Sequence, residues 1–347
     1  LLASSAASDV YKRQEKDRCM EKNLLVGNGI NIQFGGPENY SNSAIMRRAI
    51  KNINSGKYIA LTENNLTSKE QLEMLGKLVE IIDKIRAGYY AKYAEGLFML
   101  MELDRIKRTY PEKSKIESVF LEDYFLAFET FNNCCKEKDG EETSEYYRKV
   151  MFEFLQRILV DSIYNDGKIN SLYKNAPNGT KKYFEGFTNI FTTNYDYNIE
   201  NILGRKELVC HLHGEFNQLS PRYDVNSLYY KDNKNECDNL ISQKIQGMDH
   251  VYSNAVMSWS WLDKYGELIE PDARKKEELF KSIGGQVEIL GLSPNNDEHL
   301  FLLLNQNSKV KSVVYYYINN TDRQEIQHHI NKPIICKKAT NLWKTLK

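Results

Sequence analysis

Short apolar runs that end abruptly in small or polar residues constrain the fold of this chain more than any other feature. Three of them are LLVGNGIN at residues 24–31, FTTNYD at 191–196 and CHLHG at 210–214. Each run is typical of a buried strand, and Gly, Asn, Thr or His stands where the strand is expected to end. In an α/β sheet, ligands bind beyond the carboxyl ends of the strands. The pattern therefore predicts a ligand site built from these three strand ends.

Strand-like runs alternate with helical periodicity in the second half of the chain. We predict strands at 23–26, 188–191, 207–211, 286–290, 312–318 and 333–336, and helices at 197–203, 255–265, 272–283 and 298–305. Strands that alternate with helices indicate βαβ units and a mostly parallel sheet, and hence an α/β fold class. The polar, Tyr- and Asn-rich segment 217–239 is predicted to be a loop.

The segment between the first two predicted strands has a helical pattern. Apolar residues recur at three- and four-residue spacing without a break from Leu72 to Ile106, and the pattern returns at 117–131 and 145–164. We therefore predict a large inserted helical domain at 41–182, within an α/β domain made of 20–40 and 183–347. Residues 1–19 resemble translated vector sequence, so they are expected to be a non-native or disordered leader before a native start at Met20.

Composition argues against several classes of protein. Lys and Arg number 47, as do Asp and Glu, so no overall charge attracts nucleic acid or an anionic membrane. No run approaches the roughly 20 apolar residues of a membrane helix. The six cysteines form no CxxC pair and no disulfide-like spacing, which fits a reducing cytoplasm.

The first strand runs into Gly27, Asn28 and Gly29, which Ile30 and Asn31 follow. Glycines allow backbone N–H groups to approach a pyrophosphate closely, so this turn is a candidate phosphate loop. It does not match GxGxxG, and a glycine turn after a strand is often only a turn. Both interpretations stay open on the residues alone.

Thr193, Asn194 and Asp196 follow a predicted strand in the second motif. An Asn amide both donates and accepts, so it can hold a ribose hydroxyl or a water in one orientation. Thr, Asn and Asp also cap helix N-termini, which is the alternative for this cluster. Capping and ligand binding are compatible here.

His211 and His213 are two apart, so on a strand they share a face and are able to bind a metal together. No third ligand stands at a suitable spacing. A second interpretation makes His213 a general base at the strand end, because a histidine pKa lies near neutrality. A third, a core histidine with satisfied hydrogen bonds, fits His211 better than His213.

The later motif GLSPNND places Gly291 and Ser293 after another strand, as candidate contacts to ribose or phosphate. Asn296 and Asp297 are better explained as caps of the following helix. His328 and His329, on a polar late helix, are predicted to be exposed.

The motifs GNGIN, TTNYD, HLHG and GLSPNND, the last followed by VVYYYI, resemble in this order the bacterial SIR2-like (sirtuin-like) family, especially its NAD-consuming antiphage-defence members. The resemblance covers the α/β part, about half of the chain, and implies a Rossmann-like domain with an inserted module. The opening strand and GNG turn also resemble AbiH-type abortive-infection proteins.

The resemblance implies roles for residues of these motifs. The implied NAD-binding residues are Gly27, Asn28, Gly29, Ile30, Asn31, Thr193, Asp196, Gly291 and Ser293, and the implied catalytic residues are Asn194 and His213. The glycine turn would wrap the phosphates, Asp196 would contact the carboxamide, and Asn194 would hold the nicotinamide ribose and the attacking water. His213 would be the base.

Protein-deacylating sirtuins carry a paired-CxxC zinc module and a GxPDFR-like stretch, and this chain has neither. The resemblance therefore implies an NAD glycohydrolase without a metal, which depletes NAD in antiphage defence and is restrained by homo-oligomerisation or a regulatory partner. Two alternatives are a non-catalytic sensor of NAD or ADP-ribose and a metal-dependent hydrolase that uses His211 and His213.

Overall fold

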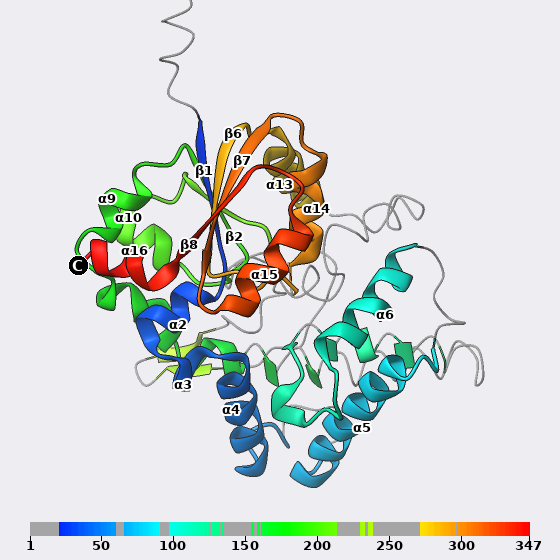
Figure 1. Ribbon diagram of the computed structural model, residues 1–347. Coiled ribbons are helices and arrows are strands. Elements are labelled where there is room, and N and C mark those ends of the chain that lie inside the picture. The colour runs from blue at the N-terminus through cyan, green and yellow to red at the C-terminus, as the bar shows by residue number, and fades with distance from the viewer. Residues whose placement is uncertain are drawn as a thin grey trace, which may run out of the picture.

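The protein is built around a six-stranded parallel sheet (Figure 1). The computed structural model describes residues 21–59, 66–90, 97–121, 161–213, 230–232, 235–238, 271–295 and 297–347, with single positions between 123 and 159. Across the sheet the strands are β3 (Val209–His211), β2 (Asn189–Thr192), β1 (Lys22–Val26), β6 (Gly285–Leu290), β7 (Val310–Tyr317) and β8 (Ile334–Lys338). The predicted α/β class is confirmed.

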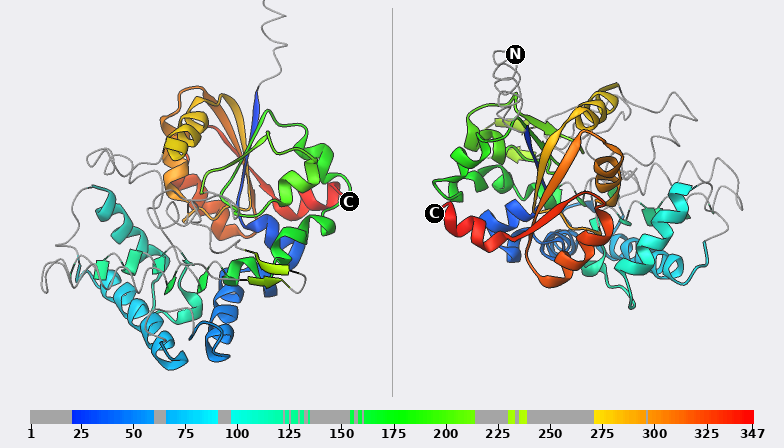
Figure 2. Two further views of the ribbon diagram at one scale, coloured as in Figure 1. Left: turned by 180° about the vertical axis from the view of Figure 1, so that it is seen from behind. Right: turned by 45° about the horizontal axis from the view of Figure 1, so that its top comes forward.

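Helices cover both faces of the sheet (Figures 1 and 2). One face carries α2 (Gly29–Gly35), α9 (Thr180–Phe184), α10 (Asn198–Leu203) and α16 (Ala339–Thr345), and the other carries α13 (Pro271–Ser282), α14 (Glu298–Gln306) and α15 (Asn320–His329). Because side chains alternate along a strand, Leu24 and Val26 belong to the core on the α2 side, whereas Leu25 belongs to the core on the α14 side. Burial on both faces explains why the strands are nearly continuous apolar runs.

The strand order identifies the edge of the sheet where a ligand is expected. Counted within the sheet, the order is 3-2-1-4-5-6, the doubly wound Rossmann arrangement. Val26 at the end of β1 pairs with Thr192 of β2 on one side and with Leu290 of β6 on the other. The order reverses between β1 and β6, and ligands of such sheets bind in the crevice beyond this switch point.

A helical segment follows β1 and contacts the sheet domain through a continuous core. It contains α3 (Pro37–Tyr40), α4 (Asn42–Asn54), α5 (Ser68–Arg86), α6 (Leu97–Thr109), η3 (Ile116–Ser118) and η4 (Lys168–Asn175). The Thr67 side chain and Glu70 form a capping box at the start of α5. Buried Leu75 and Ile106 belong to the same apolar cluster as Leu24 of the sheet. That residues 41–182 form a separate domain stays a prediction.

Two sequence-based expectations about elements were wrong. The helical pattern from Leu72 to Ile106 is broken, because α5 ends at Arg86 and Gly88 takes a positive φ of 83°, which the helix cannot continue. The expected loop 217–239 contains an antiparallel pair, β4 (Tyr230–Asp232) and β5 (Asn235–Asp238). The predicted leader 1–19 and the predicted helix 255–265 lie outside the described residues.

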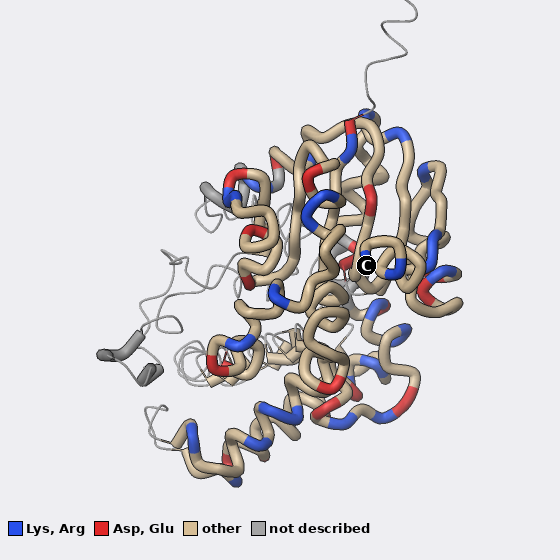
Figure 3. Tube along the Cα trace, turned by 90° about the vertical axis from the view of Figure 1, so that its left-hand side faces the viewer, with Lys and Arg blue, Asp and Glu red and all other residues tan. Residues whose placement is uncertain are grey.

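Basic and acidic residues are interspersed along the described trace (Figure 3). This distribution agrees with the equal numbers of the two kinds, 47 each, in the whole sequence. Among the helices that the structure describes, none has both the length and the apolar character required to cross a bilayer.

Candidate functional site

The turns after β1 and β6 are in direct contact at the switch point. The Gly27 N–H donates to the Leu290 carbonyl at 3.0 Å, and the Gly29 N–H donates to the Gly291 carbonyl at 2.9 Å. A Cβ on Gly27 would lie 2.7 Å from the Gly291 oxygen, and one on Gly29 would lie 2.5 Å from the Gly291 Cα. Glycine is therefore required for this backbone-to-backbone contact, which supports the interpretation of GNG as a packing turn. Its role as a phosphate loop stays a prediction.

The remaining residues of the first turn are held by hydrogen bonds and by packing. The Asn28 side chain donates to the Tyr40 carbonyl at 2.8 Å and so ties the turn to α3. Ile30 is fully buried in the apolar core, so only its backbone is available to a ligand. Asn31 is also buried, and its amide donates to the Asp196 carboxylate at 2.6 Å.

Asp196 joins the turn after β1 to the turn after β2. Its carboxylate accepts hydrogen bonds from Asn31, from the Asn198 side chain at 2.6 Å and from the Asn198 backbone N–H at 3.0 Å. The last contact satisfies the backbone N–H of the first residue of α10, whose N-cap residue, Tyr197, makes no side-chain capping bond among the described residues. Burial raises the pKa of Asp196, although the donors from Asn31 and Asn198 oppose this shift.

Asn194 lies between the ends of β1, β2 and β3. Its side-chain amide donates to the Gly27 carbonyl at 3.3 Å, its backbone N–H donates to the Thr192 hydroxyl, and its carbonyl contacts the His211 Nδ1 at 2.7 Å. Thr193 is half-buried and donates its N–H to the Val26 carbonyl. The structure thus brings Asn194 to the switch-point turns, as the sequence predicted.

His211 is a buried histidine with both ring nitrogens occupied. Nδ1 faces the Asn194 carbonyl, and Nε2 lies 2.5 Å from the Glu200 carboxylate. The predicted core role of His211 is therefore confirmed. These contacts occupy the nitrogens that the metal-site interpretation requires, and among the described residues no group of three or more His, Cys, Asp or Glu is placed to hold a metal.

His213 follows β3 at the same edge of the sheet as Asn194. Strand pairing continues to this point, since the Leu212 N–H donates to the Thr192 carbonyl at 2.8 Å. His213 is buried, and burial together with the ammonium of Lys276 lowers its pKa to about 4. The expectation that His213 titrates near neutrality is therefore wrong, because the imidazole lies in dry surroundings beside a cation. Its role as a base stays a prediction.

The turn after β6 contributes Gly291 and an exposed Ser293. The buried Tyr315 hydroxyl donates to the Leu292 carbonyl at 2.9 Å and fixes the turn. Gly291 contacts the first turn directly, whereas no described contact joins Ser293 to that turn. Asp297 is the N-cap residue of α14, without a side-chain capping bond in the described structure.

His328 is exposed as predicted, but the prediction for His329 was wrong. The side chain of His329 is only 10% exposed, with Nε2 at 3.2 Å from Asn295 and Nδ1 at 3.6 Å from Glu298. The polar composition of the helix concealed this packing, which arises because α15 lies beside α14.

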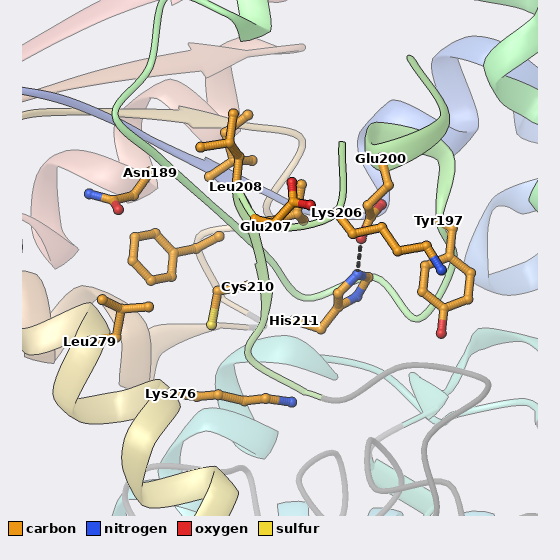
Figure 4. A pocket seen from close by; sticks show the side chains of 13 residues that line it. Asn189, Tyr197, Glu200, Lys206, Glu207, Leu208, Cys210, His211, Lys276 and Leu279 are labelled. Carbon is orange, nitrogen blue, oxygen red and sulfur yellow. Dashed lines mark hydrogen bonds and ion pairs between the residues drawn. The ribbon is translucent and has the colours of Figure 1, made fainter. Parts of the chain in front are cut away.

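A cavity of about 420 Å³ runs along the outer edge of β3 (Figure 4). Its lining includes Glu200 and His211, but no residue of the turn after β1. Asn198 and Glu200 were not predicted as site residues. One signal was available for Glu200, since it stands three residues before buried Leu203 and so shares the apolar face of the short helix.

Comparison of the chain with known protein families and curated proteins found no match.

Proposed function

We propose that this protein is an NAD glycohydrolase, which splits NAD into nicotinamide and ADP-ribose. The observation that carries the proposal is the position of Asn194, whose side chain contacts Gly27 at the switch point of a 3-2-1-4-5-6 sheet. Dinucleotides bind at this position in sheets of that order. The order of motifs that resembles the sirtuin-like family supports the same substrate.

In the proposed reaction the bond between the nicotinamide nitrogen and ribose C1′ breaks, and its electron pair leaves with nicotinamide. The pyridinium is already cationic in NAD, so no acid is needed to protonate it. Asn194 would orient the ribose and the water whose oxygen bonds to C1′, and His213 would take the proton of that water before passing it to solvent. Orientation and electrostatic stabilisation of this kind account for large rate enhancements.

The lowered pKa of His213, about 4, has a consequence for this mechanism. At neutral pH the ring is uncharged, which is the form that accepts a proton. An imidazolium would repel the positive charge that develops at C1′ in the transition state, so a neutral ring favours the reaction. A base with a low pKa takes up a proton weakly, and turnover is therefore expected to be slow.

The second candidate is a sensor that binds NAD or ADP-ribose without turnover. Two observations favour it: the Asn194 amide already donates to Gly27, and the Gly29 N–H already donates to Gly291. The Gly29 N–H must exchange its partner before it contacts a ligand, whereas the bond to Gly27 uses one of the two hydrogens of the Asn194 amide. In a cell, either activity would serve antiphage defence, with restraint by a second copy or by a partner protein.

Nicotinamide release from NAD by the full chain tests the proposal. We expect Asn194→Ala and His213→Ala each to lower the rate by on the order of a hundredfold, the cost of losing one positioned catalytic group. Asn331→Ala and His328→Ala are matched controls, because both side chains are exposed and distant in sequence from the motifs. Calorimetric NAD binding without release would favour the sensor, and absence of both binding and release would refute both candidates.

A further inference from the structure

A buried chain of contacts leads from Glu200 of α10 through His211 of β3 to the backbone of Asn194. Figure 4 shows the Glu200 carboxylate directed at the His211 ring. Oε1 of Glu200 lies 2.5 Å from Nε2, and Nδ1 lies 2.7 Å from the Asn194 carbonyl oxygen. The side chains of His211 and Glu200 are only 4% and 5% exposed, so water barely competes for these contacts.

The partners of His211 determine where its hydrogens lie. A carbonyl oxygen only accepts a hydrogen bond, so Nδ1 must donate to Asn194. If the Glu200 carboxylate is ionised, Nε2 donates to it as well, and the ring is then an imidazolium paired with Glu200. Hydrogen bonds with charged partners are shorter and about twice as strong as neutral ones, in agreement with the observed distances.

Other charged and titratable groups surround this pair. The Tyr197 ring meets the imidazole edge-on, with centroids 5.7 Å apart, and the Lys206 ammonium lies 5.3 Å from the centre of the Tyr197 ring. Lys276 of α13 lines the same cavity. The buried Asp196 carboxylate also lies within electrostatic range of His211. His211 therefore interacts with two carboxylates, those of Glu200 and Asp196, and Lys206 and Lys276 line the same cavity.

Burying Glu200 and His211 costs desolvation free energy, and one Glu200 oxygen gains no hydrogen bond in return from the part of the chain that the structure describes. Oε2 of Glu200 is buried without a hydrogen-bond partner among the described residues. Buried charges are often replaceable by apolar residues with no loss of stability. Stability alone therefore does not explain why a glutamate faces a histidine here, whereas the contact to Asn194 offers a functional reason.

We propose that Glu200 and His211 are positioning residues that hold the Asn194 backbone, so that its side-chain amide keeps one direction at the switch point. The proposal rests on the proposed function, since it assigns a task to the residues behind Asn194. The hydrogen bond from the Asn194 side chain to the Gly27 carbonyl fixes Asn194 from the β1 side. The hydrogen bond from His211 Nδ1 to the Asn194 carbonyl fixes it from the β3 side. Glu200 acts through His211, because it supplies the charge that strengthens that bond.

The decisive variant is Glu200→Gln, which keeps the shape of the side chain and removes its charge. We expect kcat for nicotinamide release to fall by about tenfold, the difference between a charge-assisted and a neutral hydrogen bond, while KM for NAD stays within about twofold. Glu207→Gln is the matched control, since Glu207 lines the same cavity and is exposed. Unchanged kcat in Glu200→Gln, or a fall of the same size in Glu207→Gln, would overturn the proposal.

Two further measurements are independent of catalysis. Nitrogen NMR of the wild-type protein with labelled histidines should show hydrogen on both ring nitrogens of His211 at about pH 8, where an unperturbed histidine is neutral. His211→Gln assigns the resonance, and a neutral ring would overturn the proposal even if Glu200→Gln does not fold. Hydrogen exchange at the Asn194 N–H should be about tenfold faster in Glu200→Gln.

The outcomes separate this proposal from the proposed function. If the wild type binds NAD without releasing nicotinamide, the glycohydrolase assignment fails. The positioning pair then stands if Asn194 exchange accelerates in Glu200→Gln, and it falls if exchange is unchanged. If the wild type is active and Glu200→Gln matches it, only the pair is refuted.

Discussion

The contact between Gly29 and Gly291 leads us to predict that Gly29→Ala lowers the free energy of unfolding. The added Cβ would lie 2.5 Å from the Gly291 Cα and 3.0 Å from its carbonyl oxygen, so both obstacles are backbone atoms that cannot rotate away. The two turns must separate, which also lengthens the 2.9 Å bond from the Gly29 N–H. Overpacking costs about 1–3 kcal/mol and the hydrogen bond about 1 kcal/mol. Alanine favours the helix over glycine by up to about 1 kcal/mol, which offsets part of this cost, so the net loss of stability is about 2 kcal/mol.

Gly76→Ala in α5 is the matched control, because a Cβ there meets nothing within 4 Å. The same substitution should stabilise the protein by about 0.5–1 kcal/mol, since glycine is unfavourable inside a helix. Urea unfolding of both variants measures the two free energies. Equal stability of Gly29→Ala and the wild type would show that the turns after β1 and β6 are not in contact. A matching loss in Gly76→Ala would refute the steric argument as well.

Three other perturbations test separate contacts. The folded-state pKa of His213, about 4, lies below the usual value of 6.5, so the unfolded chain binds the extra proton. Stability should therefore fall as pH drops from about 6.5 to 4, by about 3 kcal/mol more than in His213→Asn, as urea unfolding across this range would reveal. Tyr315→Phe removes the donor to the buried Leu292 carbonyl and should cost about 1 kcal/mol, and a neutral effect in urea would exclude that bond. Arg108 of α6 contacts Glu298 of α14 at 3.1 Å on a half-exposed surface, so a double-mutant cycle should give a coupling of at most about 1 kcal/mol. A larger value would mean that the pair is shielded from water.

The strands were predictable because both faces of the sheet are buried. Such strands consist of nearly continuous apolar residues, and the expected limits of β1, β2 and β6 lie within one residue of those observed. The break after α5 was also indicated by the sequence. The basic residue Arg86 stands in the last turn of the helix, and Gly88, which follows with a positive φ, ends it. The helix end was missed because the apolar periodicity continues on both sides of Gly88.

The sequence indicated which residues meet at the candidate site better than it indicated their pKa values and contacts. The motif order indicated that Asn194 meets the first turn, and the side chain does contact Gly27. The pKa of His213 was not predictable, because it depends on burial and on Lys276, which α13 supplies from a distant part of the chain. Glu200 likewise became significant only when folding placed it against His211.

The central position of β1 has a consequence for synthesis on the ribosome. β1 is made about 260 residues before its partner β6, an interval of roughly 15–50 s at the usual rate of translation. During that interval the apolar β1 segment lacks both partner strands until β2 is made and then still lacks β6, and long-range parallel pairing is slow to form. The helical segment emerges in between, and its buried residues belong to the same apolar cluster as Leu24 and Val26, so it is suited to shield the nascent strand until β6 arrives.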